Sequence, residues 1–248
     1  MNKANSWQIV RYFLCKFALY STFNQHTKGE YPMKLQYFGH SCFRIISDMG
    51  TTIVTDPFRG TMVGFDMPHI RCDAVTVSHH HDDHDCMEAI VNNPAVLDVA
   101  GNCLADDIAI NSYETFHDDQ KGKLRGKNLV FVFELEGIRL AHMGDIGCLD
   151  EHLIEQVGKV DVLLVPVGSV YTVDAVGAKW YADKLGAKIV VPMHYHTEEH
   201  AFSIDNVDKF LDLYSKDAIK IQLSPTLEVL WIDEEAPTTV VVLPRMAD

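Results

Sequence analysis

The feature that most constrains this chain is a cluster of histidines and aspartates that follows the apolar run Ala74–Ser78. In an extended chain alternate side chains point to the same side, so His79 and His81 face one position, while Asp83 and His84 can face a second position close by. Three imidazoles and a carboxylate are ligands typical of zinc, with manganese, iron and cobalt as competitors. The cluster therefore predicts metal binding at the end of a strand.

Further residues are needed to complete such a site. A solvated histidine-rich loop would explain the cluster if it stood alone. Zinc takes three or four protein ligands, with one position left open when the ion is catalytic. Three candidates occur downstream, each at or just after the end of an extended run: His117, Asp145 and His194. One of them alone would more often be an ordinary hydrogen-bonded residue, but the ordered set favours metal sites built by the whole chain.

Charge and cysteine content limit the partners of the chain. The formal net charge is −14, whereas phosphate binding needs a basic surface, so nucleic acid and anionic membranes are disfavoured as partners. The six cysteines are scattered without a Cys-x-x-Cys pair, which argues against a zinc ribbon or a redox dithiol. Reduced thiols in a cytoplasmic protein are the prediction.

Residues 1–32 differ in character from the rest of the chain. Their apolar stretch Trp7–Tyr20 is interrupted by Arg11 and Lys16, and its uncharged runs are too short to cross a bilayer. No clean signal-peptide pattern is present. We expect an N-terminal extension of uncertain status, either an appended segment or an upstream start before Met33, with a membrane-touching amphipathic helix as the less favoured alternative. The main domain is predicted to span residues 33–248.

Short β-rich runs and a few helical segments alternate along this domain, which predicts one α/β unit with two sheets and outer helices. The continuous apolar run Asp161–Val167 indicates a strand buried on both faces, and Glu136-Gly137 indicates a hairpin. Helices are expected around Met87–Val91 and over Leu149–Val157, Ala175–Leu185 and Asp205–Leu213, the last with Ser203 as N-cap. The other expected strands are Lys34–Phe38, Cys42–Ile46, Thr51–Thr55, Ala74–Ser78, Asp107–Ile110, Leu129–Leu135, Ile138–His142, Lys188–Pro192, Ile219–Leu223, Leu227–Trp231 and Thr239–Leu243.

The ordered motif His79-x-His81-x-Asp83-His84, followed by His117, Asp145 and His194, resembles the five ligand motifs of the metallo-β-lactamase superfamily. The resemblance covers residues 33–248 and is closest to small bacterial metal-dependent hydrolases that include ascorbate-6-phosphate lactonase-like proteins. It implies a four-layer αββα sandwich with the site at one edge of the sheets. Supporting features are Gly39-His40-Ser41, Thr55-Asp56-Pro57, Arg125-Gly126-Lys127-Asn128, His142-Met143-Gly144-Asp145 and Pro192-Met193-His194-Tyr195.

The resemblance also implies a role for each motif residue. Asp145 would bridge two metal ions, the first held by His79, His81 and His117 and the second by Asp83, His84 and His194. Asp56 would steady the histidine loop without being a ligand, while His40 and His142 would either line the site or serve as structural histidines.

One position departs from the pattern of the relatives. They often carry lysine two residues after the last motif histidine, where this chain has His196, with His200 soon after. We expect His196 to meet the substrate, which makes it a candidate catalytic residue beside Asp83. A neutral imidazole would hold an anionic group less well than lysine, so a sugar-phosphate substrate is a weaker expectation here than for the lactonase.

These roles predict a hydrolase that uses two divalent ions, zinc by preference with Mn²⁺ or Fe²⁺ as alternatives. A bridging water, with its pKa lowered from about 15.7 to about 7 by the metals, would attack a small ester, lactone, thioester or phosphodiester. Asp83 would orient this nucleophile and relay a proton.

Several alternatives stay open or are disfavoured. A di-iron redox protein of the same fold would carry Glu in place of His81, and a phospholipase-type phosphodiesterase shares the order of the motifs. Metal binding without catalysis is disfavoured by the intact motifs, and an RNA-processing nuclease is disfavoured by the acidic charge. We expect a small-molecule substrate, and homo-oligomerisation stays open.

Overall fold

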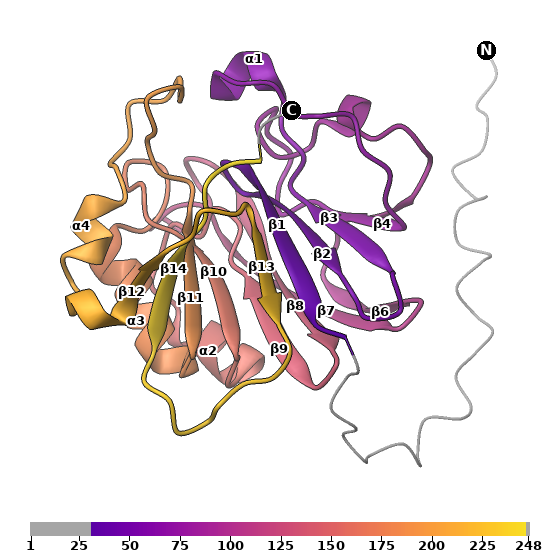
Figure 1. The fold of residues 1–248 in the computed structure, drawn as a ribbon. Helices are drawn as coiled ribbons and strands as arrows, with labels where there is room; N and C mark the ends of the chain where they lie inside the picture. Colours follow the sequence, from indigo (N-terminus) through magenta and orange to yellow (C-terminus); the bar gives the residue numbers. More distant parts are fainter. Residues whose placement is uncertain (1–30, 247–248) are drawn as a thin grey trace.

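The computed structural model describes residues 31–246, which form two β-sheets packed face to face (Figure 1). The six-stranded sheet contains, in spatial order, β13 (Thr226–Val229), β1 (Met33–Gly39), β2 (Cys42–Ile46), β3 (Thr52–Thr55), β4 (Ala74–Thr76) and β5 (Ala95–Leu97). The eight-stranded sheet contains β12 (Ile219–Ile221), β14 (Thr239–Val242), β11 (Ile189–Met193), β10 (Val162–Pro166), β9 (Ile138–His142), β8 (Lys127–Leu135), β7 (Ile108–Phe116) and β6 (Gly101–Ala105).

The main core lies between the two sheets. Leu35 and Ile53 of the six-stranded sheet share this core with Phe131 and Phe133 of the eight-stranded sheet. The side chains of β8 alternate between two cores, because Val132 belongs to the cluster under the helices. A strand covered on both faces must be apolar throughout, which explains the unbroken apolar runs of the central strands.

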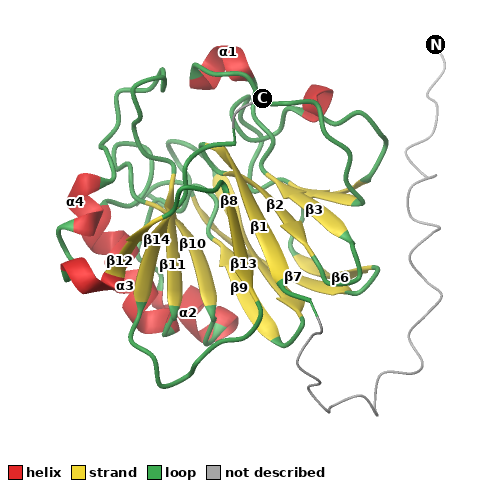
Figure 2. Cartoon of the chain, viewed as in Figure 1, coloured by secondary structure: helices red, strands yellow, loops and turns green. Residues whose placement is uncertain are grey.

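The two outer layers are unequal (Figure 2). Helices α2 (Glu151–Val157), α3 (Ala175–Leu185) and α4 (Asp208–Leu211) cover the outer face of the eight-stranded sheet. Over the six-stranded sheet, loops contribute most of the cover, with the short α1 (Gly60–Val63) and the 3₁₀ turn η1 (Met87–Ala89). The predicted αββα sandwich is confirmed, with one of its helical layers reduced to little more than loops.

Two predicted helices are shorter than expected. The segment Met87–Val91 forms only the turn η1, because Val91 donates its backbone N–H to Ile70 at 3.0 Å and the chain there is extended. The helix predicted over Asp205–Leu213 is only α4, and Ser203 is not its N-cap. The backbone N–H of Asp205 donates to Gly168 at 2.8 Å, which keeps the preceding segment out of the helix.

The strand boundaries differ mainly at one end of the eight-stranded sheet. The run Asp107–Ile110 covers only the start of β7, which pairs with β8 from Ala109 to Phe116. The edge strands β5 and β6 were not expected, because exposed edges need no regular apolar pattern. Asp150, placed near the start of a helix by the sequence, is the N-cap of α2 and accepts from the backbone N–H of Leu153 at 3.1 Å.

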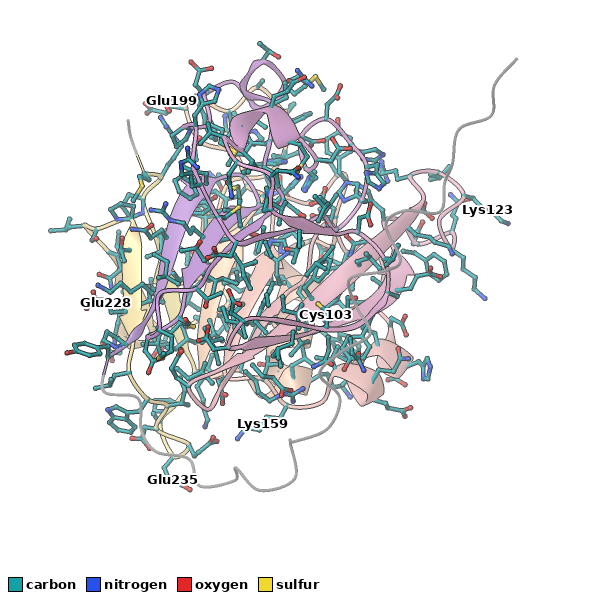
Figure 3. All side chains as sticks on the ribbon, turned by 90° about the vertical axis from the view of Figure 1, so that its right-hand side faces the viewer. Cys103, Lys123, Lys159, Glu199, Glu228 and Glu235 are labelled. Carbon is teal, nitrogen blue, oxygen red and sulfur yellow. The ribbon has the colours of Figure 1, made fainter. Side chains whose placement is uncertain are left out.

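The loops at one edge of the sandwich hold all the motif residues. Figure 3 marks this end by Glu199, which lies on the loop after β11, while Lys159 and Glu235 mark the opposite end. Between residues 31 and 246, no helix is long and apolar enough to cross a membrane. The prediction for residues 1–32 falls almost entirely outside the described residues, and the domain boundary at residue 33 stays a prediction.

Candidate metal centre

Four loops bring the seven predicted ligands together. The loop after β4 carries His79, His81, Asp83 and His84, and the loops after β7, β9 and β11 carry one ligand each. Their ligand atoms form overlapping sets in which all atoms lie within 4.8 Å of one another: His79, His81 and His117; His79, His84 and Asp145; and His40, Asp83, His84 and His194. The ordered motifs of the sequence therefore converge on one cluster, which also includes His40.

Asp145 lies at the centre of this cluster. Its Oδ2 atom is 3.1 Å from His194 Nε2, 3.3 Å from His84 Nε2 and 3.4 Å from His117 Nε2. The side chain is buried, and its second oxygen, Oδ1, has no hydrogen-bond partner among the described residues. One carboxylate thus faces imidazoles from three different loops, as a bridging ligand would.

The backbone around Asp145 is held in a tight turn. Its N–H donates to Asn128 Oδ1 at 2.9 Å, and Asn128 Nδ2 donates to the carbonyl of Met143 at 2.9 Å. Gly144 has a φ of 54°, and a Cβ there would lie 2.3 Å from Asn128 Oδ1. Only glycine allows this approach, so the Gly144-Asp145 pair is required for the position of the carboxylate.

Asp56 and Ser78 orient two of the imidazoles. Asp56 Oδ2 accepts from Ser78 Oγ at 2.6 Å and from His84 Nδ1 at 3.0 Å. Because the Ser78 hydroxyl donates to this carboxylate, it accepts from His79 Nδ1 at 2.9 Å. The Nε2 atoms of His79 and His84 are left buried without a hydrogen-bond partner. In metal sites, a ligand histidine typically forms a hydrogen bond through one ring nitrogen and binds the metal with the other. His79 and His84 therefore fit the metal ion that the sequence implies.

The electrostatics of the cluster favour a cation. Burial would lower the pKa of His84, but Asp145 and Asp83 on either side raise it well above its ordinary value. Burial would raise the pKa of Asp145, but His194 and His84 lower it well below its usual range. Burial lowers the pKa of His79 and of His117, which keeps both imidazoles neutral. The cluster therefore combines neutral ligands with a carboxylate that attracts positive charge.

The histidines of the first predicted site form the open side of the cluster. The rings of His79 and His117 have centroids 4.6 Å apart, and His81 lies 4.5 Å from His79. His79 and His117 are buried, whereas His81 is exposed. The loop after His117 is fixed by the Asp118 carboxylate, which accepts from four backbone N–H groups, those of Gln120, Gly122, Leu124 and Arg125. His81 is therefore the part of the first predicted site that faces solvent.

The second predicted site is packed against the β1–β2 turn. His194 has a φ of 50° and donates its backbone N–H to the carbonyl of His40 at 2.9 Å. A Cβ on Gly168 would lie 2.1 Å from the His194 carbonyl oxygen, so glycine is required there. His40 Nε2 is 3.2 Å from Asp83 Oδ2, and His40 Nδ1 is 3.0 Å from His200 Nε2. Burial lowers the pKa of His40 to about 3 and that of His200 to about 4, so both rings are neutral.

The remaining candidate histidines lie outside the ligand sets. His142 uses both ring nitrogens in structural bonds, since Nε2 donates to the Ser41 carbonyl at 2.8 Å and Nδ1 accepts from Gly144 N–H at 3.2 Å. His196 is exposed, and its Nδ1 is bonded to the Phe202 carbonyl at 3.1 Å. Its contact with a substrate stays a prediction. His200, for which no role was predicted, reaches the site through His40. The only signal in the sequence was its place near His196.

A cavity of about 290 Å³ lies beside the cluster rather than over it. None of the seven predicted ligands lines it, and it meets the site only through His40 and His200. Tyr195 and Arg245 are part of its wall, and Arg245 forms an ion pair with Glu199 at 2.6 Å. The candidate metal ligands therefore surround Asp145, and this cavity is adjacent to them.

Comparison with known proteins identifies the family. A family model described as "Beta-lactamase superfamily domain" matches residues 34–194, which is more than half of the chain. The chain belongs to the metallo-β-lactamase superfamily. A solved structure from Thermotoga maritima, described as a candidate Zn-dependent hydrolase of that superfamily, is 38% identical with a TM-score of 0.71. The match covers 86% of this chain and 100% of that one.

Two other similarities define the class of the protein. A "UPF0173 metal-dependent hydrolase" from Methanosphaera stadtmanae is 28% identical over 74% of this chain and 90% of its own length. The di-iron β-hydroxylase CmlA from Streptomyces venezuelae is only 15% identical with a TM-score of 0.51, over 73% of this chain and 49% of that one, and so shows the fold alone. The superfamily member described here is a metal-dependent hydrolase, and the likeness to the lactonase branch stays a prediction.

Proposed function

We propose that this protein is a dinuclear, zinc-dependent hydrolase of small esters, lactones, thioesters or phosphodiesters. The observation that carries the proposal is the convergence of three imidazole Nε2 atoms from separate loops on one oxygen of Asp145, at 3.1–3.4 Å. Three imidazoles on one side and an Asp–His–His set on the other would supply three ligands to each of two ions, and both would share Asp145.

Bound metal ions would supply an activated water and a Lewis acid for the attacked carbonyl or phosphoryl group. The residues of the chain would do the rest. Asp83 belongs to the second ligand set, and its side chain is 14% exposed. Burial alone would raise its pKa, but His84 and the bond from His40 lower it, so this carboxylate is ionised and can accept a hydrogen bond from an attacking water. Asp83 would orient the attacking water and receive its proton at a carboxylate oxygen.

The alternative of a di-iron redox protein is disfavoured at one position. Proteins of that kind resemble His-x-Glu-x-Asp-His, whereas this chain has the imidazole of His81 at the second place. Imidazole in place of carboxylate favours zinc over iron in a redox role. Metal analysis of the protein as isolated would decide between them, since two equivalents of zinc support the hydrolase and two of iron with a charge-transfer band support the redox protein.

The substrate class is tested by parallel assays on lactones, phosphodiesters, thioesters and β-lactams with the zinc-loaded protein. We expect one class to be hydrolysed in a reaction that a chelator abolishes and that zinc restores. Turnover that persists after complete removal of metal would contradict the proposal. The exposed side chain of His196 is proposed as a contact with the substrate.

A further inference from the structure

His40 lies where its ring could either bind the second metal ion or donate a hydrogen bond to Asp83. With Asp83, His84 and His194 it forms a group of side chains that could hold a metal ion. A bare Nε2 on His40 would add one more ligand to the second ion, beside Asp83, His84, His194 and the shared Asp145. An N–H at the same place would instead donate to Asp83 and leave the imidazole outside the coordination sphere. The choice depends on which ring nitrogen of His40 carries the hydrogen.

The hydrogen bonds that join His40 to His200 and Phe202 determine which ring nitrogen of His40 carries the hydrogen. The backbone N–H of Phe202 meets His200 Nδ1 at 3.3 Å, and a backbone amide can only donate. His200 Nδ1 is therefore bare, and the hydrogen of this ring is on Nε2. That N–H meets His40 Nδ1 at 3.0 Å, so His40 Nδ1 accepts and its own hydrogen is on Nε2. The His40 Nε2–H group then points at Asp83 Oδ2, 3.2 Å away.

A comparison with His84 shows why this direction matters. The Nδ1 atom of His84 faces an acceptor, the carboxylate of Asp56, at 3.0 Å, so the hydrogen of the neutral ring lies on Nδ1 and Nε2 can bind a metal ion. That is the usual support for an imidazole ligand. The Nδ1 atom of His40 faces a donor instead, so the hydrogen of this ring lies on Nε2, the nitrogen nearer the metal centre. The two imidazoles have centroids 4.9 Å apart. The hydrogen bonds of His84 suit a metal ligand, whereas those of His40 suit a hydrogen-bond donor.

The conformation of the chain keeps the His40 ring in this place. His40 has a φ of 54°, and its carbonyl accepts from the Tyr37 hydroxyl at 3.1 Å and from the His194 N–H at 2.9 Å. The ring of Phe202 stacks on His40 with a centroid distance of 5.7 Å. Both His40 and His200 are buried, so water does not compete for their hydrogen bonds.

We propose that His40 is a positioning residue for Asp83, fixed as a hydrogen-bond donor by His200, and that it is not a metal ligand. The proposal deepens the proposed function and rests on it for the consequence that the second ion is held by Asp83, His84, His194 and Asp145 alone. The Nε2–H group of His40 fixes the rotation of the Asp83 carboxylate. His200 and the Phe202 N–H act through His40.

The first test is the tautomer of His40 in the metal-free full-length protein. Long-range ¹H–¹⁵N correlation spectra of protein labelled with ¹⁵N-histidine distinguish an imidazole with hydrogen on Nε2 from one with hydrogen on Nδ1. We expect the Nε2–H form for both His40 and His200. An Nδ1–H form of His40 would overturn the proposal. This readout needs no bound metal, so it stays valid even if the wild-type protein fails to bind two ions and the proposed function is rejected.

The second test uses a matched pair of variants at residue 200. Gln in H200Q can still donate to His40 Nδ1, whereas Glu in H200E can only accept, and the two side chains have the same shape. We expect H200Q to keep the Nε2–H tautomer and H200E to place a hydrogen on His40 Nδ1. The visible spectrum of Co²⁺ at the second site should then change in H200E alone. The same spectrum and the same tautomer in both variants would contradict the proposal.

The third test separates a positioning residue from a ligand. We expect H40A to weaken zinc binding at the second site by about 10–100-fold, the range found for groups that support a ligand, and to leave the first site unchanged. H40Q, which restores a donor, should recover most of the loss. Complete loss of the second ion in H40A, with no recovery in H40Q, would show that His40 is a ligand.

Discussion

The two halves of the metal centre are built by different means. The first half consists of His79, His81 and His117; His81 is exposed, and Asp56 reaches His79 only through the Ser78 hydroxyl. The second half is buried, and Asp56, His40 and His200 form a network of hydrogen bonds around its ligands. We therefore expect the first half to hold a metal ion chiefly through imidazoles near solvent, and the second half to depend on carboxylates and on the residues that bond to them.

The largest expected effect comes from removing what the two halves share. The variant D145N keeps the shape of the side chain but removes its charge, so both halves should lose zinc and kcat/KM should fall by more than about 100-fold, beyond the range for supporting groups. Metal analysis and turnover measured together check this. D82N is the matched control, because Asp82 is exposed in the same motif loop and belongs to none of the ligand sets. A D145N protein with two ions and full turnover would exclude the bridging role.

A second pair of variants separates the two halves. H84A should reduce the zinc content from two ions to one by emptying the second half, whereas H81A should weaken the first half and leave the second filled. Isothermal titration with zinc would show one remaining class of site in each variant. H80A is the control, since His80 is exposed and bonded to Asp85 at 3.2 Å. Equal losses at both halves in H84A would show that the halves are not separable.

The two halves should also differ in their dependence on pH. Asp145 and Asp83 raise the pKa of His84 well above 6.5, so a metal ion must displace a proton from the second half at neutral pH. Burial lowers the pKa of His79 and His117, which bind without this cost. Affinity of the second half should therefore fall by about tenfold for each unit of pH decrease below the pKa of His84. Zinc titrations at several pH values would reveal it, and parallel curves for both halves would contradict it.

The smallest expected effect on metal binding is at His196. This side chain is exposed and bonded to the Phe202 carbonyl, outside both halves. H196A should leave zinc affinity within about twofold, since surface changes away from a network rarely matter. A contact with the substrate would appear as a raised KM at unchanged metal content. Loss of zinc in H196A would mean that the second half extends further than the hydrogen bonds show.

Much of the fold followed from local patterns. The strands between β1 and β3 and from β8 to β11 were expected close to their observed bounds, because apolar runs flanked by glycine are strong local signals. The helices around Met87–Val91 and Asp205–Leu213 were too long. In both, tertiary hydrogen bonds at Ile70 and Gly168 take backbone groups that a helix would use. Edge strands β5 and β6 had no pattern to detect.

The sequence by itself determined the residue types and order of the metal centre, because ligand chemistry requires histidine and aspartate at strand ends. It also left His40 and His142 equivalent, each a lone histidine beside a glycine motif. Only the tertiary structure separated them, by placing His142 against Ser41 and Gly144 and by placing His40 between His200 and Asp83. The role of a histidine is set by what each of its two nitrogens meets. Those partners are up to 160 residues apart in the chain, so no local pattern could reveal them.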